Sequence, residues 1–559
     1  MINLVREPRS VTGDRPQEPV VRTQVTPAPV GPVQRLHGDG AGASVLERLV
    51  VFIVAVAGYI WVGNWLVVQL HVVGFDTLED QLRALMVWHN DPAKLSAIGW
   101  DGEPLRQLAV VPFAMFAGPV SNLTVVPIAT SLFGGLLAVT VNGLLRRGEV
   151  PAVLRWVLVL AFAVNPLLVF EAATGRSTVI WVALLAAAVS SLVAWYDSAA
   201  VRHIMSAGVV LALAFLAGFT TVIWVVLAMI LVAGVLGGLR ARSAEVEGTL
   251  IGLAAPATYV VAVWTVLAWI ATGRLGGWLP HQLGASGAVA HREVARATFE
   301  LVVASSPLTL VVVPALLLVG LLRRDVVCAW LAVVVTTAVA IPAVAAWWRL
   351  TPAPLELDDG LPILVLTVVA GAWLARIGGR VLVAAGLAAL LVATVPWTLN
   401  RMESYPRQHL AVAFAHAITT GESQEGVTAG GHRIGIGDEL AMARQIEQLS
   451  PDRGSILTDD TATYAVMLLT GRPEWFLDRV DHGDARWQAA RRDVPASVDL
   501  MLLSTEPGSV DQLTQLLPEV AAGTDARFPV VYRTERYLLV RVQPGTDLTS
   551  GPTSEESLR

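Results

Sequence analysis

The sequence has little cysteine, lysine or charge, and each shortage excludes a class of protein. Cys328 is the only cysteine, so an intramolecular disulfide is excluded, and no cysteine–histidine set has the spacing of a metal site. Lys94 is the only lysine among 39 basic residues. The sequence has no block of basic residues interleaved with aromatic ones, so nothing in it predicts nucleic-acid binding. Only 15% of the residues are charged, where soluble domains have about 25%, so this is not an ordinary soluble protein.

Long apolar runs take the place of charge. The chain is 54% hydrophobic with a mean hydropathy of +0.61, which is typical of a protein that crosses the membrane many times. Apolar stretches of about 17–25 residues, the length that spans a bilayer, predict about eleven transmembrane helices. They lie near residues 48–70, 122–145, 153–170, 177–195, 204–218, 221–239, 248–271, 306–322, 326–347, 360–375 and 381–399. Arginine in place of lysine, with many alanines and valines, is typical of a high-GC bacterial genome.

The arginines predict the orientation of these spans, because cytoplasmic loops carry the excess of positive charge. One set of connections holds Arg146, Arg147, Arg155, Arg202, Arg240, Arg242, Arg323, Arg324, Arg376 and Arg380. The alternate set holds the acidic loop 71–121, the connection 171–176 and the loops 272–305 and 348–359. Eleven spans therefore place the N-terminus in the cytoplasm and the C-terminus outside the plasma membrane.

Composition divides the chain into four regions. Residues 1–45 are rich in proline and predict a disordered cytoplasmic tail, and residues 46–400 form the transmembrane domain. Residues 401–545 predict a small extracytoplasmic α/β domain, and residues 546–559 a second disordered tail. In the α/β domain we expect helices over 438–449, 461–470, 484–492 and 509–519, strands over 456–458 and 498–504, and a hairpin over 529–532 and 536–542.

Acidic residues gather just after the first span. One face of the predicted helix carries four charged residues at helical spacing: Asp76, Glu79, Asp80 and Arg83. The other side is apolar and carries Leu78, Leu82, Leu85 and Met86. We expect this apolar side to lie against the bilayer or the bundle. A carboxylate there can deprotonate an acceptor hydroxyl as a general base, and a close pair could instead hold a divalent cation. The alternative is a capping box, with Asp76 as the N-cap and Glu79 reaching back to it.

A second acidic position lies between the third and fourth spans, in the segment 165–177. Glu171 is close to the membrane face there, and an acid so near hydrocarbon is a functional candidate because its burial is costly. The alternative is an ion pair with Arg176 in water. Further along the outer loop, the apolar segment 108–117 is too short to span, so we expect it to re-enter the membrane or to lie at its surface.

Arginines on the outer side could hold an anionic headgroup, because the guanidinium fork fits a phosphodiester. They are Arg83, Arg106, Arg176, Arg274, Arg292, Arg296 and Arg349. Of these, Arg176, Arg83 and Arg349 are the residues that we predict to bind substrate, together with Glu171.

The order of these parts resembles the GT-C class of membrane glycosyltransferases, which use polyprenyl-phosphate-linked sugars. In that class an outer loop with an acidic amphipathic helix follows the first span, a proline-containing turn leads into the second, and a short outer loop joins the third and fourth. Asp76, Glu79 and Asp80 match the acidic position. Residues 103–105 (Glu-Pro-Leu) resemble the turn and residues 165–177 the short loop. The sequence departs from the pattern in spreading the acid pair into Asp-x-x-Glu-Asp and in lacking the second proline of the turn.

The resemblance implies an inverting transfer of a sugar from a polyprenyl-phosphate donor to an extracytoplasmic glycan, lipid or protein acceptor. Asp76, or otherwise Asp80, would act as base on the acceptor hydroxyl. Arg176 or another outer arginine would hold the lipid phosphate, with Glu171 orienting it. The C-terminal domain would help to select the acceptor.

Two other functions stay open. The same fold would serve a catalytically inactive scaffold or lipid-carrier-binding protein, in which the acids only cap a helix and meet water. A transporter is the third possibility, but the spans hold few charges and no matched pair of interrupted helices. An enzyme is expected to place Asp76 or Asp80 at an outer cavity, with Glu171 and an arginine within about 10 Å.

Overall fold

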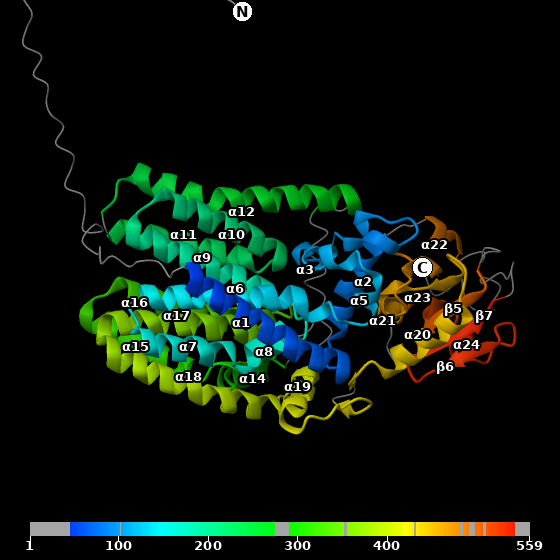
Figure 1. The fold of residues 1–559 in the computed structure, drawn as a ribbon. Coiled ribbons are helices and arrows are strands. Elements are labelled where there is room, and N and C mark those ends of the chain that lie inside the picture. The colour runs from blue at the N-terminus through cyan, green and yellow to red at the C-terminus, as the bar shows by residue number, and fades with distance from the viewer. Residues whose placement is uncertain are drawn as a thin grey trace, which may run out of the picture.

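The computed structural model describes residues 45–542 apart from 101, 239, 274, 276–289, 351–354, 430–431, 481–484, 491–497 and 507–509. The two predicted tails (except Val45) and Arg274 lie outside the described residues. Long helices form a bundle, and a small α/β unit lies beyond one end of it (Figure 1). Between these two bodies lie the short helices that follow the first span.

The bundle matches the predicted spans. Among the described residues, eight helices are long and apolar enough to cross a membrane, or up to ten if each bent helix pair is one span. The helices of the bundle are α1 (Val45–Gly63), continued by the π-helix η2 (Asn64–Gln69), α6 (Val126–Arg147), α7 (Ala152–Ala163), α8 (Pro166–Ala173), α9 (Thr178–Ser198), α10 (Val201–Ala217), α11 (Thr221–Gly238), α12 (Ser243–Thr272), α14 (His291–Ser305), α15 (Thr309–Arg323), α16 (Val326–Trp347), the 3₁₀ turn η4 (Leu357–Asp359), α17 (Gly360–Gly378) and α18 (Arg380–Met402). Each of the eleven predicted spans overlaps one of them, which confirms a multi-pass helical membrane protein.

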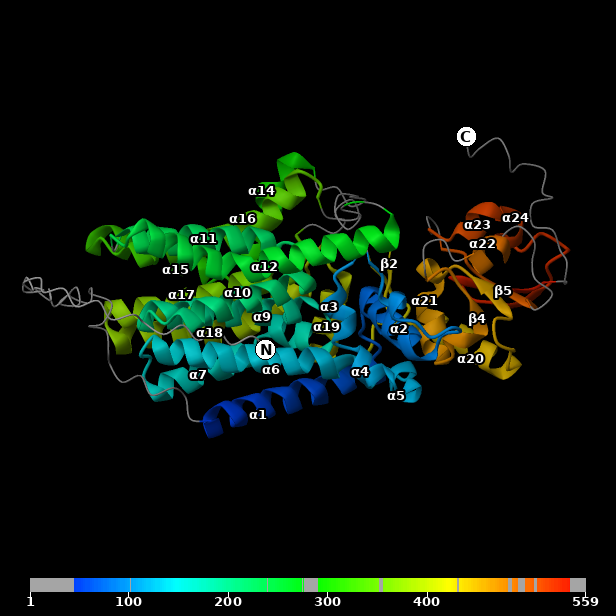
Figure 2. The same cartoon turned by 90° about the horizontal axis from the view of Figure 1, so that it is seen from above.

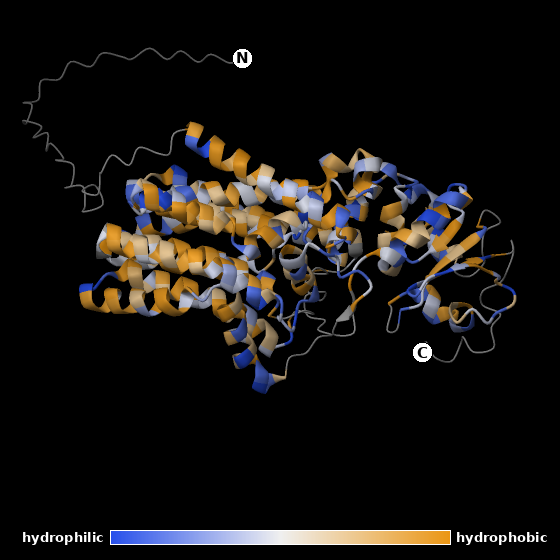
Figure 3. Ribbon diagram, turned by 60° about the horizontal axis from the view of Figure 1, so that its bottom comes forward, coloured by the Kyte–Doolittle hydropathy of each residue, from blue (hydrophilic) through white to orange (hydrophobic). Residues whose placement is uncertain are grey.

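The two ends of the bundle carry different charge. At one end, Glu47 on α1 accepts hydrogen bonds from Arg146 on α6 and from Arg155 on α7, each at 2.9 Å. Arg376 pairs with Asp197 at the same end, where α9 and α17 finish. The opposite end bears the acidic loop and the α/β unit (Figure 2). Apolar residues dominate the middle of the bundle, whereas hydrophilic residues lie at both of its ends and are mixed with apolar ones in the α/β unit (Figure 3). The sequence therefore separated the two sets of connections correctly, and which set faces the cytoplasm stays a prediction.

Short helices connect the bundle to the α/β unit: α2 (Phe75–His89), η3 (Leu95–Ile98), α3 (Pro104–Leu108), α4 (Val111–Ala114) and α5 (Ala117–Ser121). The apolar face of α2 is buried as predicted. Its Leu78, Leu82, Leu85 and Met86 join a core that also contains Met442, Ile446 and Leu468 of the α/β unit. The expectation that this face lies against the bilayer or the bundle is therefore wrong in the main, because its largest partner is the helix α21.

The α/β unit is built on a five-stranded mixed sheet in the order β4-β3-β5-β7-β6. β3 pairs in parallel with β4 and β5, whereas β7 is antiparallel to β5 and β6. Its strands are β3 (Ile456–Thr458), β4 (Phe476–Leu477), β5 (Leu500–Ser504), β6 (Val530–Arg533) and β7 (Tyr537–Arg541), and its helices are α20 (Gly437–Leu449), α21 (Asp460–Thr470), η5 (Pro473–Trp475), α22 (Ala485–Ala490), α23 (Gln512–Leu516) and α24 (Pro518–Ala521). Earlier in the chain, α19 (His409–Thr420) packs on the bundle against α8 and α18, and β1 (Thr428–Ala429) and β2 (His432–Arg433) form a separate two-stranded antiparallel sheet. The predicted strands and hairpin are present, whereas α19 and β4 were not expected.

Candidate functional site

The acidic helix α2 begins earlier than the capping-box pattern predicts. Gly74 is the N-cap, in an extended conformation, and no side chain caps the helix. Asp76 therefore lies inside the first turn, and Glu79 forms an ion pair with Arg83 at 2.8 Å instead of reaching back. The capping box is wrong, and the carboxylate of Asp76 is left to interact with other parts of the chain.

Arg176 is the centre of the cluster. It follows Gly175, whose φ of +82° lets the chain turn between α8 and α9. Its Nε donates to Asp358 at 2.8 Å, and its Nη2 contacts the same carboxylate and lies 3.4 Å from Glu356. Nη1 donates to Asp76 at 3.3 Å. One guanidinium, only 11% exposed, thus joins the acidic helix to the connection before α17.

A second arginine, Arg106 on α3, faces the same acids. Its guanidinium lies 3.5 Å from Asp80, 3.9 Å from Asp76 and 3.2 Å from Glu103. Gln107 donates to Asp80 at 3.1 Å. Burial raises the pKa of Asp80 to about 6, because desolvation outweighs the opposing charge of Arg106. Asp80 is therefore a carboxylate whose basicity is close to that needed near neutral pH.

Glu171 is placed by a local signal that the sequence contains. Pro166 occupies the first turn of α8, and Asn165 caps that helix by accepting from the Leu167 N–H at 3.1 Å. Glu171 is fully buried, and neither of its oxygens has a hydrogen-bond partner of ordinary geometry. It interacts electrostatically with Asp358, Arg176 and Asp76. The alternative of an ion pair in water is therefore wrong, and Glu171 belongs to the buried side of the cluster.

Several residues of the cluster were missed. Glu356 and Asp358 come just before the tenth predicted span, so two acids beside hydrocarbon were an available signal. Gln408 contacts both of these acids and also accepts from the Leu357 N–H at 3.1 Å. It had no sequence signal, because it lies in a polar stretch after the last span. Arg106 was one of seven outer arginines with nothing to single it out.

Two predicted residues are not brought to Arg176. Arg83 pairs with Glu79 on α2 itself and interacts with Asp460 of the α/β unit. Arg349 is exposed just after α16, and no ion pair of the described residues joins it to the acids. For the cation alternative, the described residues include no group of three or more histidines, cysteines or acids arranged to hold a metal ion.

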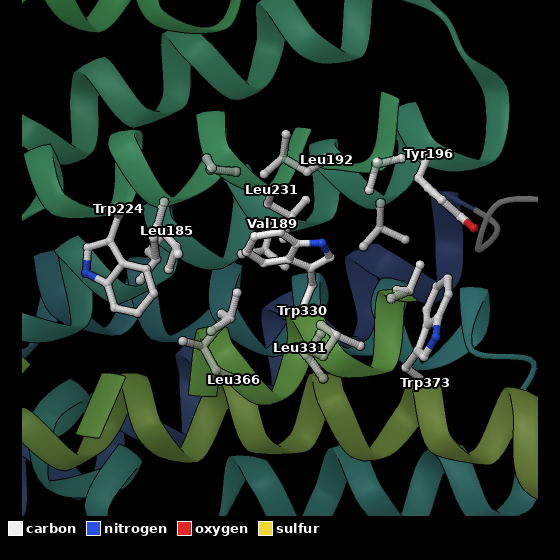
Figure 4. A pocket seen from close by; sticks show the side chains of 18 of the residues that line it. Leu185, Val189, Leu192, Tyr196, Trp224, Leu231, Trp330, Leu331, Leu366 and Trp373 are labelled. Carbon is white, nitrogen blue, oxygen red and sulfur yellow. The ribbon is translucent and has the colours of Figure 1, made fainter. Parts of the chain in front are cut away.

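An apolar cavity of about 120 Å³ lies elsewhere, among α9, α11, α16 and α17 (Figure 4). Leu185, Trp224, Trp330 and Trp373 are among its lining residues, and none of the clustered acids or arginines is. The cavity is therefore separate from the acid–arginine cluster. That Asp76 or Asp80 lines a cavity of its own stays a prediction.

Fold and cluster together define a multi-pass membrane protein with an acid–arginine site between its bundle and a terminal α/β unit. No protein-family model and no curated protein sequence matches the chain. Among solved structures, ArnT from Cupriavidus metallidurans, in the apo state and bound to undecaprenyl phosphate, aligns with a TM-score of 0.56 and 12% identity, over 88% of this chain and 97% of its own. The mycobacterial arabinofuranosyltransferase AftD aligns with a TM-score of 0.44 and 16% identity, over 89% of this chain and 40% of its own. The ArnT alignment confirms the GT-C-like fold that the motifs predicted.

Proposed function

We propose that the protein is a membrane glycosyltransferase that moves a sugar from a polyprenyl-phosphate donor to an acceptor outside the cytoplasm. The observation that carries this proposal is the ion pair between Asp76 and Arg176, 3.3 Å apart at one end of a bundle with the fold of ArnT. It joins a carboxylate that can take a proton to a guanidinium that can hold a phosphate. The undecaprenyl phosphate bound by ArnT supports a lipid of the same chemistry here.

The proposed reaction is an inverting displacement. The acceptor hydroxyl gives its proton to Asp76, or otherwise Asp80, while its oxygen attacks the anomeric carbon from the face opposite the phosphate. The bond between that carbon and the phosphate oxygen breaks, and the polyprenyl phosphate leaves. Because the leaving group is already activated, the protein mainly has to position two substrates and stabilise the phosphate charge.

Phosphate binding and base release are linked in this proposal. Arg176 is shared by Asp76, Glu356 and Asp358, so a donor phosphate must displace a carboxylate to reach the guanidinium. The side chain of Asp76 is 42% exposed, against 27% for Glu356 and 13% for Asp358, so Asp76 is the partner that exchanges with least rearrangement. Donor binding would thereby free Asp76 to accept the proton.

The test is a transfer assay with the purified full chain and a panel of radiolabelled polyprenyl-phosphate sugars. Transfer from at least one donor to an extracted envelope acceptor is the expected result. No transfer from any donor, by protein that is folded and binds polyprenyl phosphate, would overturn the proposal.

A non-catalytic protein that binds a lipid carrier is the second candidate. The observation that favours it is the ion pair between Asp76 and Arg176, because an acid already paired with a guanidinium can have a purely structural role. A protein with this function would bind polyprenyl phosphate and transfer no sugar. Asp76→Asn should then leave every property of the protein except ion pairing unchanged.

Transfer is expected to decline as the pH falls through about 6. Burial raises the pKa of Asp80 to about 6, so its carboxylate is charged above that pH and neutral below it. If Asp80 is the base, kcat/KM should fall about tenfold per pH unit below this value, because a base works only when ionised. If Asp80 only adds negative charge beside Asp76, the fall should be smaller and should level off at low pH. Measuring kcat/KM between about pH 5 and 8 checks this. In Asp80→Asn, kcat/KM of any residual activity should no longer fall at low pH. A wild-type profile of kcat/KM that is flat over this pH range would contradict a role of the Asp80 carboxylate in transfer.

Gly74→Ala is expected to lower kcat about 10- to 100-fold. A Cβ at Gly74 would lie 2.4 Å from the Oδ1 of Asp76 and 3.2 Å from the Nη1 of Arg176, so it would push apart the pair that the proposal needs. Gly58→Ala is the matched control, because a Cβ at that position on α1 meets nothing within 4 Å. Equal kcat values for the two variants would show that this pair has no role in transfer.

A further inference from the structure

The first turn of α2 is held by side chains of the C-terminal α/β unit. Arg536 places its guanidinium carbon 5.0 Å from the centroid of the Phe75 ring, in a cation–π arrangement. Tyr464 on α21 meets the same ring edge-on, with centroids 6.4 Å apart. We infer that these three residues, the Phe75 clamp, position the acids of α2 for transfer. The α/β unit then sets the geometry of the proposed base, an inference that rests on the proposed function.

Arg536 is itself fixed, which makes it a rigid support. It is 7% exposed, and its Nη2 donates to the Gly435 carbonyl at 3.0 Å. Its Nη1 lies 3.1 Å from Glu439, a fully buried acid in the first turn of α20, and its Nε lies 3.7 Å from Asp438. One hydrogen bond and two ion pairs restrict the orientation of this guanidinium, so the Phe75 ring that packs on it is restrained as well.

The Phe75 clamp contacts the first turn of α2, which carries Asp76. Phe75 directly precedes Asp76, and it lies on the same helix face as Leu78 and Leu82, which pack into the α/β core. The acids on the other face meet Arg176 and Arg106 from the bundle side. The helix therefore joins two bodies, and its hold on the α/β unit decides where the acids meet the arginines. A misplacement of about 1 Å in such a group can cost about 100-fold in rate.

The test compares Phe75→Leu, which removes the aromatic face, with Phe75→Trp, which retains it, in the full chain in detergent. Phe75→Leu should lower kcat about 10- to 100-fold while the KM for donor changes less than about twofold, because Arg176 still holds the phosphate. Phe75→Trp should restore most of kcat. Arg541→Met, an exposed arginine of the same hairpin, is the control expected to match wild type.

A double-mutant cycle and hydrogen exchange complete the test. Adding Arg536→Met to Phe75→Leu should lower kcat by less than the two single losses together, because either change alone already removes the contact between these two side chains. Amides of residues 75–80 should exchange faster in Phe75→Leu than in wild type or Arg541→Met. Additive losses, an unchanged kcat in Phe75→Leu, or equal exchange in all variants would overturn the clamp. If wild type transfers no sugar, the proposed function fails, whereas the exchange measurement still decides whether the clamp holds α2.

Discussion

Asp76→Asn is expected to lower the rate of sugar transfer about 10²- to 10⁴-fold, the contribution of a positioned general base. Asparagine keeps the shape of the side chain and can no longer accept a proton. The side chain of Asp76 is 42% exposed, so the neutral variant should fold and express normally. Steady-state kinetics with the best polyprenyl-phosphate donor measure the effect. The KM for donor should stay the same or fall, since Asp76 no longer competes with phosphate for Arg176.

Asp80→Asn extends the same experiment, because either acid could be the base. The loss of transfer rate in Asp80→Asn should be as large as that in Asp76→Asn if Asp80 takes the proton directly. It should be smaller if Asp80 only adds negative charge beside Asp76. Glu422→Gln, an exposed acid that precedes β1, is the control and should retain wild-type kcat. Full activity in both Asp76→Asn and Asp80→Asn would eliminate these two acids as the base.

Local pattern was enough for the spans and for most of the sheet. A run of about 20 apolar residues has few alternatives to a membrane helix, and alternating arginine-rich and acidic connections order such helices without any knowledge of their packing. Strand β5 (Leu500–Ser504) and the β6–β7 hairpin could be predicted for the same reason, since each is a short apolar segment bounded by turn residues. These features depend on neighbours in the sequence.

The family resemblance placed Asp76, Glu171 and Arg176 in one site, but the pairing of Arg176 with Asp358 could not be predicted, because it depends on neighbours in space. Asp358 lies 182 positions from Arg176 and Asp76 lies 100 positions away, so only the packed bundle brings them together. The capping box failed for a related reason. Phe75 contacts Tyr464 and Arg536, and the helix begins at Phe75, one residue before Asp76. Asp76 therefore lies inside the helix, where it faces Arg176 and Arg106. Tertiary contacts thus overrode a local preference worth only about 1 kcal/mol.

Arg176→Gln is expected to cost about 3–5 kcal/mol in the free energy of unfolding, besides abolishing transfer. The side chains of Arg176 and Asp358 are 11% and 13% exposed, and removing the arginine would leave Asp358 beside the buried acid Glu171 without its cation. An unpaired buried charge is far more costly than an intact buried pair is stabilising. Denaturant or thermal unfolding in one detergent measures the difference, with the exposed Arg349→Gln expected within about 0.5 kcal/mol of wild type.

Adding Asp358→Asn to Arg176→Gln separates electrostatics from packing. If the cost comes from an uncompensated carboxylate, neutralising that carboxylate should recover a large part of the stability, and the two changes together should cost less than their sum. Activity should not return, because the proposed phosphate ligand is still missing. A double variant as unstable as the sum of the two single variants would mean that Arg176 supports the fold mainly by packing, for which its position 5.9 Å from the Phe170 ring centroid is the available contact.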